Sequence, residues 1–177
     1  TEAAAAGAAI EVEEKELIAS VFALGDTIVR EVMVPRTDMT TAAADDTISA
    51  VLDLADEKGF SRIPVYGEGI DDVIGVCLVK DLVRVERAGG GDRSVMSLMR
   101  KARFVPETKH ADALLREMQA GDHHLAVVVD EYGGTAGLVT LEDLVEELVG
   151  EIVDETDNEE PLVRPLAGGK LLVHGRM

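Results

Sequence analysis

Apolar residues recur along the chain at two spacings, one helical and one typical of strands. In residues 48–55 and again in 111–118 they fall at i, i+3, i+4 and i+7, the spacing of an amphipathic helix. Each of these segments is followed by a short β-type run, RIPVY in the first case and LAVVV in the second. The runs GVCLVKDL and GLVTLEDL come next. Each half therefore predicts the order strand, helix, strand, strand, helix.

The two halves match each other when the sequence is shifted by 62 or 63 positions. A unit of this size buries too little surface to be stable alone, so we expect two copies packed through their sheets in a mixed α/β (α+β) fold. The first repeat is predicted to span residues 28–88 and the second repeat residues 93–153. The Gly-rich, polar run ERAGGGDR suits the connection between them.

Segments of different character flank the repeats. Residues 1–27 predict a connecting helix that ends at Gly25, with Asp26 and Thr27 capping the next element. Its apolar stripe comprises Ile10, Leu17, Ile18, Val21 and Leu24, with Glu14 as a polar gap. Residues 154–177 predict an acidic linker and the truncated start of another domain. The sequence contains no secretory leader and no apolar run of eighteen residues, so we do not expect this stretch to cross a bilayer.

Composition narrows the possible functions. About 46% of the residues are apolar and the formal charge is -18, which favours a folded protein and disfavours nucleic acid as a partner. The charge is uneven, with nine basic and five acidic residues in 80–116 but ten acidic and no basic residues in 142–160. Such polarity suits a charged ligand or partner, although solvated helices and tails share it. Cys77 is the single cysteine, so neither an internal disulfide nor a Cys-based zinc site is expected.

Several motifs resemble one family closely. The tandem units look like a pair of CBS domains (a Bateman module), and VREVMVPRTDM, SRIPVY, VKDL and VVDEYGGTAGLVTLEDLVEELVGEIVDE resemble the cytosolic part of the CorC/cyclin M (hemolysin-C-like) magnesium/cobalt transporters. The resemblance covers roughly residues 12–160. It implies a homodimeric regulatory module at the cytoplasmic face of the cell membrane, with a transmembrane domain before it and a CorC/HlyC domain after it. It also implies binding of an adenine nucleotide: ATP with Mg²⁺ foremost, or AMP or ADP.

Thr140 and Asp143 lie where a predicted strand ends and a predicted helix begins. Such a junction exposes unpaired backbone N–H groups and the positive end of a helix dipole, which suit oxygen-rich ligands. The Asp143 carboxylate could accept hydrogen bonds from a ribose diol, and Thr140 could add a hydroxyl. The same Thr-x-x-Asp spacing is also that of a plain helix cap. Both interpretations are open at this stage, and the family resemblance favours nucleotide binding.

We expect the first repeat to supply the opposite wall of that site. The Arg62 guanidinium is the candidate phosphate contact, because it binds two oxygens and keeps its charge. Phe60 and Ser61 are candidates for the base or a phosphate. Mg²⁺ bridging the phosphates would offset the acidic surroundings, with Glu142 or water completing an oxygen shell. The remaining candidates are Val34, Pro35 and Met39, which would form an apolar slot for adenine, and Pro64 as a further nucleotide-binding residue.

Other features argue for binding rather than catalysis. In the first repeat Asp81 matches Asp143, but Leu78 replaces Thr140, so we expect one strong nucleotide site per chain and a weak or empty second one. His123 and His124 lack partner ligands at metal-binding spacing, and EYGGTAG predicts a turn. No nucleophile with its base is signalled, so we expect no enzyme. The alternatives are a nucleotide sensor attached to a soluble protein and, less favoured, an ATP hydrolase.

Overall fold

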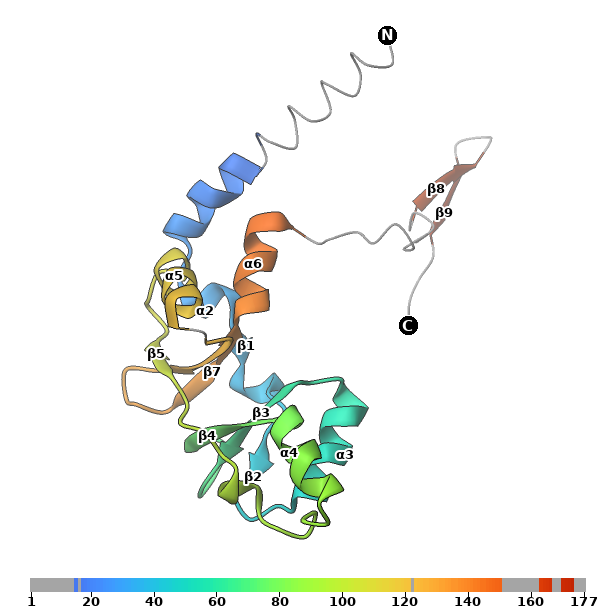
Figure 1. The fold of residues 1–177 in the computed structure, drawn as a ribbon. Helices are drawn as coiled ribbons and strands as arrows, with labels where there is room; N and C mark the ends of the chain where they lie inside the picture. The colour runs from blue at the N-terminus through green and yellow to red at the C-terminus, as the bar shows by residue number, and fades with distance from the viewer. Residues whose placement is uncertain (1–14, 16, 122, 151–162, 167–169, 174–177) are drawn as a thin grey trace.

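The computed structural model describes residues 15, 17–121, 123–150, 163–166 and 170–173, and it confirms the α/β fold. Two lobes are stacked, each with two helices against a small sheet (Figure 1). The first repeat contains β2 (Ala42–Ala43), α3 (Ile48–Lys58), β3 (Arg62–Tyr66), β4 (Val73–Leu78) and α4 (Val79–Arg87). The second repeat contains β5 (Phe104–Pro106), α5 (Ala111–Gly121), β6 (Leu125–Val129), β7 (Thr135–Thr140) and α6 (Leu141–Val149). The predicted order of elements is therefore confirmed in both halves.

Each sheet also takes a segment from outside its own repeat. A short strand, β1 (Val34–Pro35), precedes β2 and pairs antiparallel with β7, so the sheet orders are β1-β7-β6-β5 and β2-β3-β4. In the reciprocal place, Arg100 forms an isolated bridge with Val76 of β4. A segment near the start of each repeat therefore pairs with the sheet of the other repeat. The described residues also form α2 (Val29–Val32) and the 3₁₀ turns η1 (Arg36–Asp38) and η2 (Val95–Ser97).

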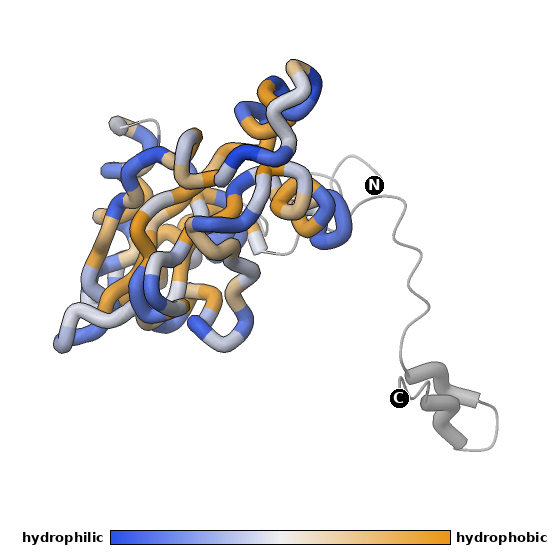
Figure 2. The backbone as a smooth tube through the Cα atoms, turned by 90° about the horizontal axis from the view of Figure 1, so that it is seen from below, coloured by the Kyte–Doolittle hydropathy of each residue, from blue (hydrophilic) through white to orange (hydrophobic). Residues whose placement is uncertain are grey.

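Three apolar clusters hold this arrangement together. One core lies where α3 and α4 cover the sheet of the first repeat and another where α5 and α6 cover that of the second, and the latter also includes Leu24 and Val29, which precede β1. A third cluster lies between the sheets, which confirms that the repeats pack through them. In Figure 2 many hydrophobic segments lie toward the middle of the folded chain, and hydrophilic segments occupy many of its outer turns. The buried residues of the third cluster are Met39, Val73, Val76, Leu125, Val127 and Leu138.

The segment before the repeats differs from its prediction at the cap. Residues 17–26 are helical, so the helix continues one residue past Gly25. Thr27 does not cap the next helix; its hydroxyl donates to the carbonyl of Ala23, 3.0 Å away, in the preceding one. The predicted cap is therefore wrong, and Glu31 instead accepts a hydrogen bond from the backbone N–H of Ile28. Of the predicted stripe, Leu24 is buried, whereas Leu17, Ile18 and Val21 are exposed, and Ile10 and Glu14 lie outside the described residues.

The remaining described segments are the turn between β6 and β7 and a hairpin near the end of the sequence. Asp130 accepts hydrogen bonds from the N–H groups of Tyr132 and Gly134, both at 2.9 Å, and Gly133 adopts a φ of 84°. Residues 131–134 of EYGGTAG therefore form the turn between β6 and β7, as predicted, and its last three residues begin β7. Beyond it, β8 (Val163–Leu166) and β9 (Lys170–Val173) pair as an antiparallel hairpin. Its assignment to a CorC/HlyC domain stays a prediction.

Candidate functional site

A pocket of about 330 Å³ lies at the junction of β7 and α6, and we call it the Thr140 pocket. Three segments far apart in the sequence form its walls: the stretch around β1 and η1, the turn that enters β3, and the start of α6. Its lining residues are Val34, Asp38, Met39, Thr40, Gly59, Phe60, Ser61, Arg62, Pro64, Leu125, Leu138, Thr140, Glu142 and Asp143. Nine of the ten residues expected from the sequence thus border one cavity.

Pro35 is the predicted residue that does not line this pocket. It pairs with Gly137 in the β1–β7 ladder and is exposed, whereas its neighbour Val34 lines the pocket. Successive residues of a strand face opposite sides, so one of the two had to point away. Val34 and Met39 form the apolar side of the pocket, together with Leu125 and Leu138, which the sequence did not single out.

At the N-terminus of α6, Thr140 and Asp143 form a reciprocal capping box. The Thr140 hydroxyl accepts from the Asp143 N–H at 3.1 Å, and one Asp143 carboxylate oxygen accepts from the Thr140 N–H at 2.7 Å. Both side chains are only partly buried and also border the pocket. The hydroxyl proton of Thr140 and the second oxygen of Asp143 have no partner among the described residues. The pair therefore caps the helix and still offers one donor and one acceptor to a ligand.

The charges in the Thr140 pocket are mostly negative. Three carboxylates, those of Asp38, Glu142 and Asp143, line it against the single guanidinium of Arg62. Arg62 and Glu142 form an ion pair of 3.8 Å in which the Glu142 side chain is well exposed. Such a long, half-exposed pair contributes little stability, so both groups remain available to a ligand. This lining suits a ligand that combines hydroxyls and phosphates with a cation.

The equivalent position in the first repeat has a different chemistry. Leu78 precedes α4 and provides no side-chain cap. The Asp81 carboxylate, which matches Asp143, forms ion pairs with Arg100 at 2.5 Å and Arg84 at 3.6 Å. The hydroxyl is missing and the carboxylate already has two cationic partners. This half therefore lacks the groups that would recognise a sugar diol.

Other titratable groups singled out in the sequence lie outside the Thr140 pocket. Burial, and to a lesser degree the nearby Asp81 carboxylate, raises the pKa of the Cys77 thiol from 9.0 to about 11, which makes it a poor nucleophile. His123 accepts a hydrogen bond from Arg103 at 2.8 Å. Within the described part of the chain, no group of three or more His, Cys, Asp or Glu residues could hold a metal ion directly.

Five lining residues were not expected from the sequence, namely Asp38, Thr40, Gly59, Leu125 and Leu138. Asp38 and Thr40 flank Met39, and Gly59 precedes Phe60, so their adjacency to candidate residues was the available signal. Gly59 also ends α3 with a φ of 72°, a conformation that favours glycine. Leu125 and Leu138 carry no local signal, because strand pairing brings them to the pocket.

Comparison with known proteins decides the family. The model of the CBS domain matches residues 29–88 and 95–150. The structure of the CBS domain of a bacterial CNNM/CorC family Mg²⁺ transporter is 44% identical, with a TM-score of 0.78, and the match covers 86% of this chain and 93% of that one. This chain is a CBS-domain pair of the CNNM/CorC family. A related structure of such a domain in complex with ATP is 45% identical, with a TM-score of 0.75, covering 78% of this chain and 99% of that one.

Curated relatives of this CBS-domain pair are longer proteins. The magnesium and cobalt efflux protein CorC of Escherichia coli strain K12 is 37% identical over 86% of this chain and 52% of its own length. A UPF0053 protein of Mycobacterium tuberculosis is 52% identical over 84% of this chain and 35% of its own length. The chain thus spans about a third to a half of these relatives. Among the residues that the structure describes, no helix is long and apolar enough to span a membrane.

Proposed function

We propose that this CBS-domain pair binds an adenine nucleotide in the Thr140 pocket, with ATP and Mg²⁺ favoured over AMP or ADP. In this proposal Thr140 and Asp143 hold the ribose, and Arg62 with Ser61 contacts the phosphates. Phe60 and the apolar side of the pocket, including Val34, Met39 and Pro64, take the adenine. One observation carries the proposal: these side chains come from three distant segments and line one cavity at a strand-to-helix junction. Similar CBS domains in complex with ATP and with AMP support it.

The charges of the Thr140 pocket explain why we favour ATP together with Mg²⁺. A triphosphate would lie near three carboxylates and one guanidinium. Without a counter-ion, like-charge repulsion would oppose binding. Mg²⁺ takes oxygen ligands and usually keeps several waters, so phosphate oxygens, water and the exposed Glu142 carboxylate fit its chemistry. Glu142 is the residue of this chain that would contact the ion.

We further propose that the module regulates a magnesium/cobalt transporter and works by binding rather than catalysis. In the full-length chain it would follow a transmembrane domain, at the cytoplasmic face of the membrane, and pair with a second copy through its CBS repeats. Exposed apolar side chains on α6, Val145 and Val149, fit such a dimer contact. A nucleotide controls such a pair only if it binds one arrangement of the two copies more tightly than another.

A calorimetric titration with ATP, ADP and AMP, each with and without Mg²⁺, tests the proposed ligand. We expect one strong site per chain for Mg²⁺–ATP, and we expect Thr140→Ile, which fills the pocket with an apolar side chain, to remove it. An unchanged affinity in that variant would refute the proposed site. Two equivalent Mg²⁺–ATP sites per chain would refute the proposed difference between the repeats. Phosphate release from Mg²⁺–ATP that disappears in Asp143→Asn would instead support an ATP hydrolase.

A further inference from the structure

A second and larger cavity, of about 650 Å³, lies between the repeats on the first-repeat side, and we call it the Lys80 crevice. It is bordered by the strand-to-helix junction of β4 and α4, by residues 100–103, and by the start of β6. Five Lys or Arg residues and two His residues line it, and none of its lining residues is acidic within the described part of the chain. The Lys80 crevice is thus the cationic counterpart of the mostly acidic Thr140 pocket.

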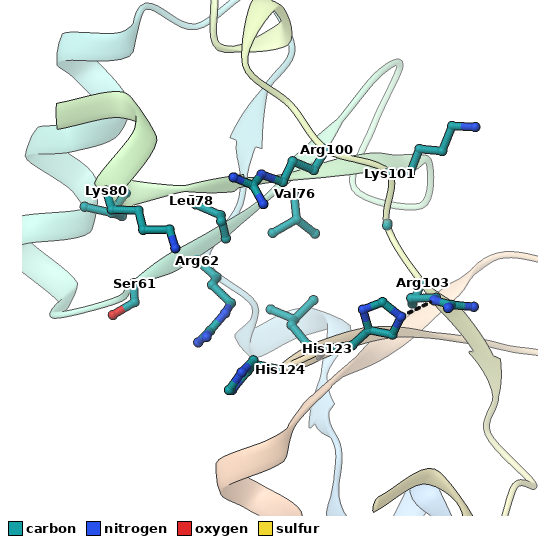
Figure 3. A pocket seen from close by; sticks show the side chains of 13 residues that line it. Ser61, Arg62, Val76, Leu78, Lys80, Arg100, Lys101, Arg103, His123 and His124 are labelled. Carbon is teal, nitrogen blue, oxygen red and sulfur yellow. Dashed lines mark hydrogen bonds between the residues drawn. The ribbon is translucent and has the colours of Figure 1, made fainter. Parts of the chain in front are cut away.

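This concentration of positive charge is unusual for the chain. The formal net charge is -18, yet Arg62, Lys80 and Arg100 border one crevice. Figure 3 shows these three side chains ending on one side of the crevice, whereas Lys101 and Arg103 point away from them. Lys80 forms no ion pair among the described residues, Arg62 has only its long contact to Glu142, and Arg100 pairs with the Asp81 carboxylate, which does not line the crevice. A concave site lined by one sign of charge raises the local concentration of opposite charges.

The same crevice lacks the groups that recognise a nucleoside. Leu78 provides no hydroxyl at the start of α4, and the Asp81 carboxylate is held by Arg100 and Arg84. Arginine and lysine bind phosphate oxygens with short, charge-assisted hydrogen bonds. A nucleic acid would need an extended basic surface, which a chain this acidic does not provide. A small anion with several phosphates fits a concave and locally cationic site better.

We propose that the Lys80 crevice binds anions of the pyrophosphate or triphosphate class, through Lys80, Arg100 and Arg62, without selecting a ribose. Arg62 borders both the Lys80 crevice and the Thr140 pocket, so its removal would affect both sites. Lys80 and Arg100 border only the crevice. Variants of these two residues therefore separate this inference from the proposed nucleotide site.

The test is a calorimetric titration of the 177-residue chain with inorganic triphosphate in the absence of Mg²⁺. We expect binding to the wild type and an affinity loss of about tenfold or more in Lys80→Ala/Arg100→Ala, since each replaced cation removes charge-assisted hydrogen bonds. The matched control is Arg30→Ala/Arg116→Ala, which also removes two exposed cations that pair with carboxylates but do not border the crevice. The control should change the affinity less than about threefold, as expected for distant surface charges.

Thr140→Ile locates the anion, because this change alters only the other pocket. Triphosphate should bind this variant as it binds the wild type, ATP without Mg²⁺ should bind it about as tightly as triphosphate, and adenosine should not bind it. No binding to the wild type, an equal loss in both double variants, or a loss in Thr140→Ile would overturn the inference. ATP binding Thr140→Ile far more tightly than triphosphate would show that the crevice selects a nucleoside.

If Mg²⁺–ATP failed to bind while triphosphate bound, the proposed nucleotide site would fail and this inference would stand. Lys80→Gln alone provides a second, milder test should the double variant misfold.

Discussion

Thr140 has two roles in our account, capping α6 and binding the ribose, and Thr140→Val tests whether both are real. Valine keeps the branched shape and removes the hydroxyl that accepts from the Asp143 N–H at 3.1 Å. Asp143 itself remains. Its carboxylate can still accept the hydrogen bond from the backbone N–H of residue 140, which is 2.7 Å long in the wild type. The change therefore removes one cap contact and one ligand contact with little change in packing volume.

The two roles predict separate effects of known size. Losing a threonine N-cap costs about 1 kcal/mol, which lowers Tm by about 2–4 °C in a protein of this size. Losing a neutral hydrogen bond to a ligand costs about 0.5–1.5 kcal/mol, which weakens Mg²⁺–ATP binding by about twofold to tenfold. Asp143→Asn should weaken it more, by about tenfold to 150-fold, because hydrogen bonds to a charged group are worth about 1.5–3 kcal/mol.

The assay is thermal denaturation together with calorimetric titration of the same protein samples. Thr47→Val is the matched control, since Thr47 caps α3 by accepting from the Ala50 N–H at 3.3 Å and does not line the Thr140 pocket. We expect both valine variants to lower Tm and only Thr140→Val to weaken Mg²⁺–ATP binding. A Thr140→Val protein with reduced Tm and unchanged affinity would show that the capping box is purely structural.

The role of Mg²⁺, the packing of the core and the buried Cys77 thiol can each be tested separately. Chelating Mg²⁺ should weaken ATP binding by the Lys80→Ala/Arg100→Ala variant. In this variant only the Thr140 pocket is left to bind ATP, and that pocket has an excess of carboxylates. An unchanged affinity would contradict the role of the ion. Leu144→Ala should lower the free energy of unfolding by about 2–5 kcal/mol, because Leu144 is fully buried, whereas Leu17→Ala at an exposed position should change it by less than about 0.5 kcal/mol in urea denaturation. With a pKa of about 11 against 9.0, the buried Cys77 thiol keeps its proton in the folded state after the unfolded state has lost it. Stability should therefore fall as pH rises from about 9 to 11, and Cys77→Ala should flatten that slope; an identical pH dependence in both proteins would contradict the shift.

The sequence by itself determined the features of this protein that depend on residues close together in the chain. The helices of both repeats follow from apolar residues three and four positions apart, because that spacing places them on one helix face. Thr140 and Asp143 could be paired in advance because a capping box joins residues three positions apart at a helix start. The duplication was readable for the same reason, since each copy repeats the same local pattern.

Tertiary structure alone decided which residues meet at the sites. The pairing of Val34 with Leu138 joins positions more than a hundred residues apart, and this contact places β1 beside the Thr140 pocket. The same pairing leaves Pro35 outside the pocket. The gathering of Arg62, Lys80 and Arg100 in one crevice also depends on how the two repeats pack. Local spacing encodes periodicity within an element, whereas a cavity forms between elements, so its lining depends on strand pairing and packing that no single stretch of sequence specifies.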